Sequence, residues 1–148
     1  MTWFLLVPVA LAAGTAVSMQ FGVNSQLRGV AGGPVAAAAV SFIVGTVALV
    51  ALTLVLNGGQ PSFGEVANAP WWVWTGGLLG AFYVFASVIL TPRLGAATTV
   101  ALIATGQVLA SIIIDHFGPF RVATQEATPL RLLSAIPIVS GVFFVQRF

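Results

Sequence analysis

Long hydrophobic runs, separated by short breaks rich in glycine, proline and polar residues, make up almost the whole chain. Each run is roughly 20 residues long, which is the length that an α-helix needs to cross a bilayer. The runs predict five membrane helices, at about residues 3–27, 34–56, 70–90, 94–114 and 129–146. They do not alternate in the segments of about ten residues that a membrane β-barrel requires.

Residues that begin or break helices support these boundaries. Pro34, Pro70 and Pro129 suit the first helical position, where the N–H that proline lacks would have no partner. The segment Asn57–Pro61 carries strong helix breakers after the second run. Pro137 lies inside the last predicted helix, so we expect a kink there.

The composition is that of an integral membrane protein with no soluble domain. Of the 148 residues, 59% are hydrophobic and 5% are charged, whereas soluble domains carry about 25% charged residues. The net charge of +2 rests on few groups that form no basic patch, so we expect no nucleic-acid partner. Membrane lipid is the partner that this composition predicts.

Polar side chains recur at four-residue spacing on three of the predicted helices, and this spacing places them on one helix face. The three polar stripes are Gln20 and Asn24; Tyr83, Ser87 and Thr91; and Gln107, Ser111 and Asp115. A polar group inside a membrane needs a partner on another helix or a water-filled cavity. Any one stripe could serve as interhelical glue, or bond its hydroxyls to its own backbone.

Three such stripes in one small bundle favour a shared polar cavity. A small-molecule substrate bound there would exchange hydrogen bonds with the amides, and a tyrosine would add a ring face and a hydroxyl. We predict that five residues line the cavity: Gln20, Asn24, Tyr83, Gln107 and Ser111.

Asp115 and His116 are adjacent at the end of the fourth predicted helix. Histidine titrates near neutral pH and a desolvated aspartate can hold its proton, so the two residues are candidates for proton coupling. The alternative, which we favour, is that both lie in the wet interfacial region and end the helix. No acidic residue falls in the middle of a predicted helix, which argues against antiport through a central carboxylate.

Small residues also recur at four-residue spacing, which lets helix backbones approach closely in a membrane. We predict helix packing at Gly14, Ser18 and Gly22, at Ser41 and Gly45, and at Gly76 and Gly80. Catalysis has no comparable support: the chain has no cysteine, no pair of midplane carboxylates and no phosphate loop. We therefore expect no enzyme activity, no metal site and no cofactor.

Several short motifs recur in an order that resembles the YdcZ-like branch of the drug/metabolite transporter superfamily. They are Gln20–Leu27, Gly33-Pro34, Ser41-Phe42 with Gly45, Pro70–Trp72, Gly76–Tyr83, Pro92–Gly95, Gly106-Gln107 and Asp115–Gly118. The resemblance covers nearly the whole chain and implies a five-helix inner-membrane exporter. Small multidrug exporters of that superfamily carry a glutamate in the first helix, where this chain has neutral Gln20 and Asn24.

The resemblance also implies an inverted partner. Larger members of the superfamily join two five-helix halves of opposite orientation, because a repeat of five helices must invert. A single half invites an antiparallel homodimer or a paralogue heterodimer. The arginines of a five-helix arrangement divide three to two between the membrane faces: Arg28, Arg93 and Arg147 against Arg121 and Arg131. This weak bias suits insertion in both orientations.

The sequence thus predicts an all-α integral membrane protein of the bacterial inner membrane, a five-transmembrane-helix bundle that acts as an antiparallel dimer. We expect it to move a small polar metabolite or drug-like molecule by alternating access. Two alternatives remain open at this point: a passive channel, and a membrane subunit that does not transport.

Overall fold

A computed structural model describes residues 3–56, 64, 68–119 and 124–147. All regular structure in these residues is helical, so the predicted all-α class is confirmed. The chain divides into two compact units, Met1–Pro92 and Arg93–Phe148. Glu65 and Arg121, which lie in predicted loops, fall outside the described residues.

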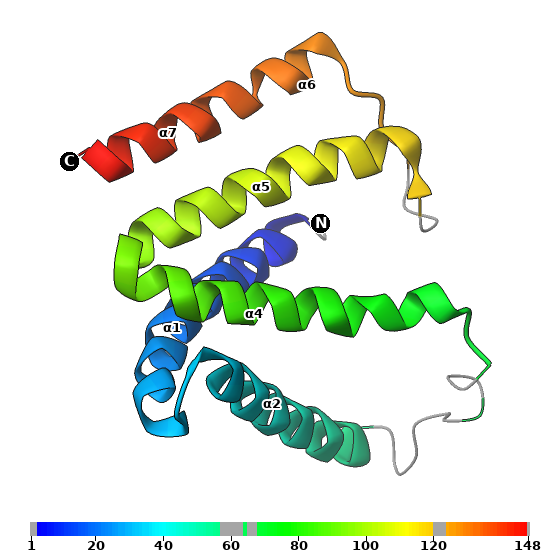
Figure 1. Cartoon of the computed structure of the whole chain (residues 1–148). Helices are drawn as coiled ribbons and strands as arrows, with labels where there is room; N and C mark the ends of the chain where they lie inside the picture. Colours follow the sequence, from blue (N-terminus) through cyan, green and yellow to red (C-terminus); the bar gives the residue numbers. More distant parts are fainter. Residues whose placement is uncertain (1–2, 57–63, 65–67, 120–123, 148) are drawn as a thin grey trace. The chain divides into compact units, whose positions relative to one another are not determined.

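The first unit holds α1 (Trp3–Ala31), α2 (Pro34–Leu56), a short 3-10 helix η1 (Trp71–Trp74) and α4 (Thr75–Leu94) (Figure 1). α1 continues past the predicted end at Leu27, so Arg28 is helical rather than part of the turn. The turn consists of Gly32 and Gly33, whose φ angles of 84° and 144° favour glycine. α2 then begins directly at Pro34, as predicted.

The core of the first unit forms where α1, α2 and α4 meet. Ala37 and Ala38 of α2 are buried with Val84 and Val88 of α4, and Leu27 of α1 packs against them. Hydrocarbon side chains gain little by leaving lipid, so membrane helices associate through close packing between small residues. The two alanines provide that close approach.

Gly80 marks a tight contact between α4 and α2. A Cβ atom added to Gly80 would lie 3.3 Å from Cζ of Phe42. A Cβ added to Gly14, Gly22, Gly45 or Gly76 would meet nothing within 4 Å. Packing at those four glycines stays a prediction that would need a further neighbour, and packing at Ser18 and Ser41 also stays a prediction.

The second unit holds α5 (Ala96–Phe117), α6 (Pro129–Leu133) and α7 (Ala135–Arg147), with α7 returning along α5 (Figure 1). The helix predicted at 129–146 is therefore two helices, which meet at Ser134. The break has a simple cause. Pro137 has no N–H to donate, and its ring crowds the carbonyl of Leu133, so the helix is interrupted one turn before the proline.

Within the part of the chain that the structure describes, four helical segments are long and apolar enough to cross a membrane: Leu6–Ala31, Pro34–Leu56, Trp71–Leu94 and Ala96–Phe117. In the most apolar stretch of each segment, at most 17% of the residues are buried, as expected for helices surrounded by lipid. The segment Pro129–Val145 is apolar but shorter. A fifth crossing stays a prediction.

The contact at Gly80 can be tested with a matched pair of substitutions on α4. We expect Gly80→Val to lower the free energy of unfolding by about 1–3 kcal/mol, because the new side chain must displace the Phe42 ring. Gly76→Val adds the same side chain to the same helix where the structure leaves space, so it should change stability much less. Thermal unfolding of both variants in detergent measures the difference. Equal losses would contradict the contact.

Candidate functional site

One face of α1 is turned toward α4. The ring of Phe21 lies 5.7 Å from the ring of Tyr83, centroid to centroid. Further along α1, Leu27 packs against the cluster that contains Val84 and Val88. Asn24 lies between these two contacts on the same helix face, and it is only 3% exposed. Its amide is therefore buried within one turn of Phe21, the residue through which α1 contacts Tyr83 of α4.

Two buried polar groups of the first unit have no hydrogen-bond partner among the described residues: Nδ2 of Asn24 and Oγ1 of Thr91. Ser87 of α4 differs, because its hydroxyl donates to the carbonyl of Val84 at 2.8 Å. Leaving a buried donor unpaired costs about 1–3 kcal/mol. A water or a polar solute that paired with these groups would recover that free energy, so the α1–α4 contact is a candidate binding site.

The structure brings together part of the predicted lining. Tyr83 contacts Phe21 of α1, while buried Asn24 lies one turn after Phe21 and half-buried Gln20 lies just before it. Gln107 and Ser111 are exposed residues of α5 in the second unit. The hydroxyl of Ser111 donates to the carbonyl of Val108 at 2.8 Å, as in the own-backbone alternative. A role of Gln107 and Ser111 in a shared cavity stays a prediction.

Thr91 was not among the predicted lining residues. Its place in the stripe with Tyr83 and Ser87 was visible from the spacing. Spacing does not reveal which hydroxyl bonds to its own helix. In the structure Ser87 does so and Thr91 does not, which is what distinguishes two residues on one face.

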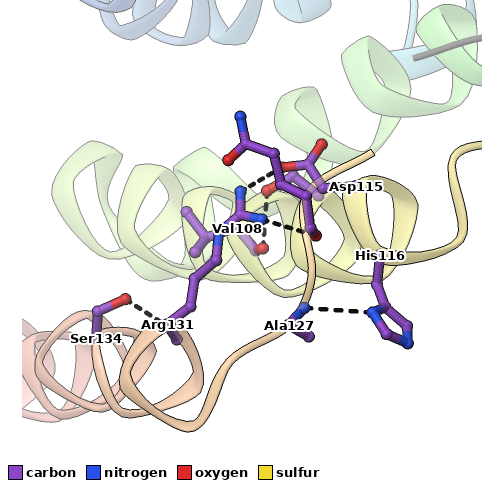
Figure 2. Close-up of polar contacts among 8 residues, drawn as sticks. Val108, Asp115, His116, Ala127, Arg131 and Ser134 are labelled. Atoms are coloured by element: carbon purple, nitrogen blue, oxygen red, sulfur yellow. Dashed lines mark hydrogen bonds and ion pairs between the residues drawn. The ribbon is translucent and has the colours of Figure 1, made fainter. Parts of the chain in front are cut away.

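A second polar cluster closes the connection between α5 and α6 (Figure 2). Arg131 of α6 forms an ion pair with Asp115 at the end of α5, and it also donates to the carbonyl of Gln125 at 3.1 Å. The N–H of Gln125 donates in turn to the backbone carbonyl of Asp115 at 2.8 Å. These bonds tie the described part of the loop to both helix ends.

His116 belongs to the same cluster. Its Nδ1 accepts a hydrogen bond from the N–H of Ala127 at 3.2 Å, which requires an unprotonated Nδ1 (Figure 2). In the structure both residues hold the loop at the end of α5. Their role in ending the helix and their role in proton coupling both stay predictions. Among the described residues, no group of three or more His, Asp or Glu side chains could hold a metal ion.

Comparison with known proteins identifies the family. A family model described as "Putative inner membrane exporter, YdcZ" matches residues 5–144. The chain belongs to the YdcZ family. The "Inner membrane protein YdcZ" of Escherichia coli (strain K12) is 36% identical over 111 residues, which are 71% of this chain and 70% of the relative. No solved structure matches the chain significantly.

The family confirms the resemblance found in the sequence. Together with the apolar helices, it makes this YdcZ-family member a multi-pass protein of the inner membrane.

The state of the Asn24 amide predicts the sign of a stability change. Asn24→Leu replaces an unpaired buried amide with an apolar side chain of the same heavy-atom number and branching, so the free energy of unfolding should stay the same or rise by up to about 2 kcal/mol. Phe21→Ala on the same face should lower the free energy of unfolding clearly, though by less than the about 3–5 kcal/mol of a soluble core, because only its packing is lost; this control shows that the assay detects packing there. Thermal unfolding of both variants measures the effects. A clear loss of stability in Asn24→Leu would mean that the amide is interhelical glue.

Proposed function

We propose that this protein exports a small polar solute across the inner membrane, and that the solute binds at the contact between α1 and α4. The observation that carries the proposal is the unpaired amide of Asn24, buried beside the Phe21–Tyr83 contact. The unpaired hydroxyl of Thr91 adds a second unused hydrogen-bonding group on α4. The family description as an exporter supports the direction of transport.

The chemistry of these helices favours hydrogen bonding over charge as the means of recognition. α1, α2 and α4 contain no Asp or Glu. A cationic drug would therefore find no carboxylate on them. The groups that we propose as the first-unit lining are amides and hydroxyls, which suit a neutral or weakly charged polar metabolite. Tyr83 would supply an aromatic face beside them.

Alternating access would follow from an inverted pair of copies. The glycines of α1, α2 and α4 whose Cβ positions meet no neighbour leave flat strips of helix on which a second copy could slide. In this proposal Gln107 and Ser111 rest on sequence spacing alone, as does proton coupling through Asp115 and His116.

Export can be tested without knowing the solute in advance. Mass spectrometry of the medium should show at least one polar metabolite enriched when cells overproduce the protein. Purified protein in liposomes should then move that metabolite with saturation and counterflow. Asn24→Leu should slow transport about tenfold, the effect of losing one net hydrogen bond of about 1.5 kcal/mol, and Gln20→Leu should slow it less.

Gln26→Leu is the matched control, because Gln26 is an exposed amide on the same helix. It should leave transport unchanged. Flux that does not saturate and shows no counterflow would favour a channel. Full transport by the double variant Asn24→Leu/Gln20→Leu, at normal expression, would rule out the proposed pocket.

The inverted pair makes a separate prediction about orientation. The chain contains no cysteine, so Thr2→Cys and Phe148→Cys each introduce a single labelling site. We expect each site to react with a membrane-impermeant thiol reagent from both faces of the membrane, in intact cells and in everted vesicles. Labelling of each terminus from one face only would contradict the antiparallel homodimer and leave a paralogue as the inverted partner.

A further inference from the structure

A pocket of about 380 Å³ lies where α1 turns into α2. Its lining comes from all three long helices of the first unit: Ser25, Arg28 and Gly29 of α1, Gly33 and Pro34 at the turn, and Pro92 of α4. Arg28 is the charged side chain in this lining. Asn24 and Thr91, the two residues with unpaired buried groups, directly precede the lining residues Ser25 and Pro92.

The pocket is positively charged and holds no counter-ion from the described residues. The ion pair among the described residues joins Arg131 to Asp115 in the second unit. No described Asp or Glu pairs with Arg28. α1 and α2 carry no acidic residue. α2 also directs the positive end of its helix dipole toward Gly33 and Pro34. The N–H of Gly33 already donates to the carbonyl of Arg28, and Pro34 has no N–H, so the Arg28 guanidinium supplies the donors that favour an anion with several acceptor oxygens.

An apolar groove of about 400 Å³ lies between α2 and α4, two of the helices that also line the pocket. Val35, Ala39 and Phe42 contribute to one wall, and Phe82 and Phe85 to the other. Val35 directly follows Pro34, and Phe85 lies seven residues before Pro92 on nearly the same face of α4. The groove therefore lies next to the pocket along one pair of membrane-spanning candidates.

We propose that the pocket and the groove together bind one anionic phospholipid, with its phosphate at Arg28 and an acyl chain along the groove. Phosphate offers the oxygens that arginine pairs with in bidentate geometry. Basic pockets between membrane helices bind anionic lipid headgroups. A free phosphate shares the headgroup chemistry but leaves the groove empty. The proposal does not depend on export.

Native mass spectrometry of the purified protein in detergent tests this lipid site. Phosphatidylglycerol should bind about tenfold more tightly than phosphatidylcholine with the same acyl chains, since one charge-assisted hydrogen bond is worth about that factor. Inorganic phosphate at the same concentration should not displace the lipid. Arg28→Gln should abolish the preference and Arg28→Lys should retain part of it. Arg147→Gln, which removes the same charge from the end of α7, should leave it unchanged.

A second variant tests the groove without changing the charge. Ala39 is exposed on the groove wall, so Ala39→Phe fills the groove and should weaken phosphatidylglycerol binding several-fold. Gel filtration and thermal unfolding confirm that each variant is folded. A preference that survives Arg28→Gln overturns the headgroup site, and an unchanged affinity in Ala39→Phe overturns the acyl-chain site. Displacement of the lipid by inorganic phosphate would make the pocket a site for a soluble anion. None of these outcomes affects the transport test of Asn24.

Discussion

A bilayer interior offers no hydrogen-bond partner, and the structure of this chain follows from that constraint. Backbone groups must pair within their own segment, so the membrane-spanning candidates are helices. Side-chain hydroxyls follow the same rule. Thr15, Thr53 and Thr105 each donate to the carbonyl four residues earlier, at 2.8–2.9 Å. Against this background the unpaired groups of Asn24 and Thr91 are exceptions. Groups that the chain leaves unpaired in a dry environment are groups that something else is expected to satisfy.

The second consequence of lipid as solvent is sparse packing. Leucine gains little by leaving lipid for protein, so contact between helices depends on where backbones can approach. In the first unit this happens at Ala37 and Ala38 and at the Gly80–Phe42 contact. Most large apolar side chains of the helices remain exposed. A fold held by so few close contacts has little free energy to offset the cost of burying an unpaired polar group. Such a group is therefore expected where a ligand or partner pairs with it.

Hydropathy and breaker residues predicted the all-α class and the membrane location because bilayer thickness fixes helix length. α1 runs to Ala31, past the predicted end near Leu27, because the helix ends only at Gly32 and Gly33, whose positive φ angles favour glycine. Four-residue spacing predicted that Tyr83, Ser87 and Thr91 share a face, but it could not show which hydroxyl bonds to its own backbone. The partner of Asp115 was also missed, because Arg131 is brought to it by a turn whose path the sequence does not reveal.

The two arginines Arg28 and Arg131 show how the same charge can serve two purposes. Arg131 meets Asp115 and the carbonyl of Gln125, so its charge is satisfied within the second unit, where it fixes a loop. Arg28 lines a pocket beside a helix N-terminus in a segment with no acidic residue. A guanidinium remains charged at any physiological pH, so it cannot avoid the need for a partner by losing its proton. Its partner must therefore be water or an anion from outside the described residues. At the end of a membrane helix beside an apolar groove, a lipid phosphate is the anion present at the highest local concentration.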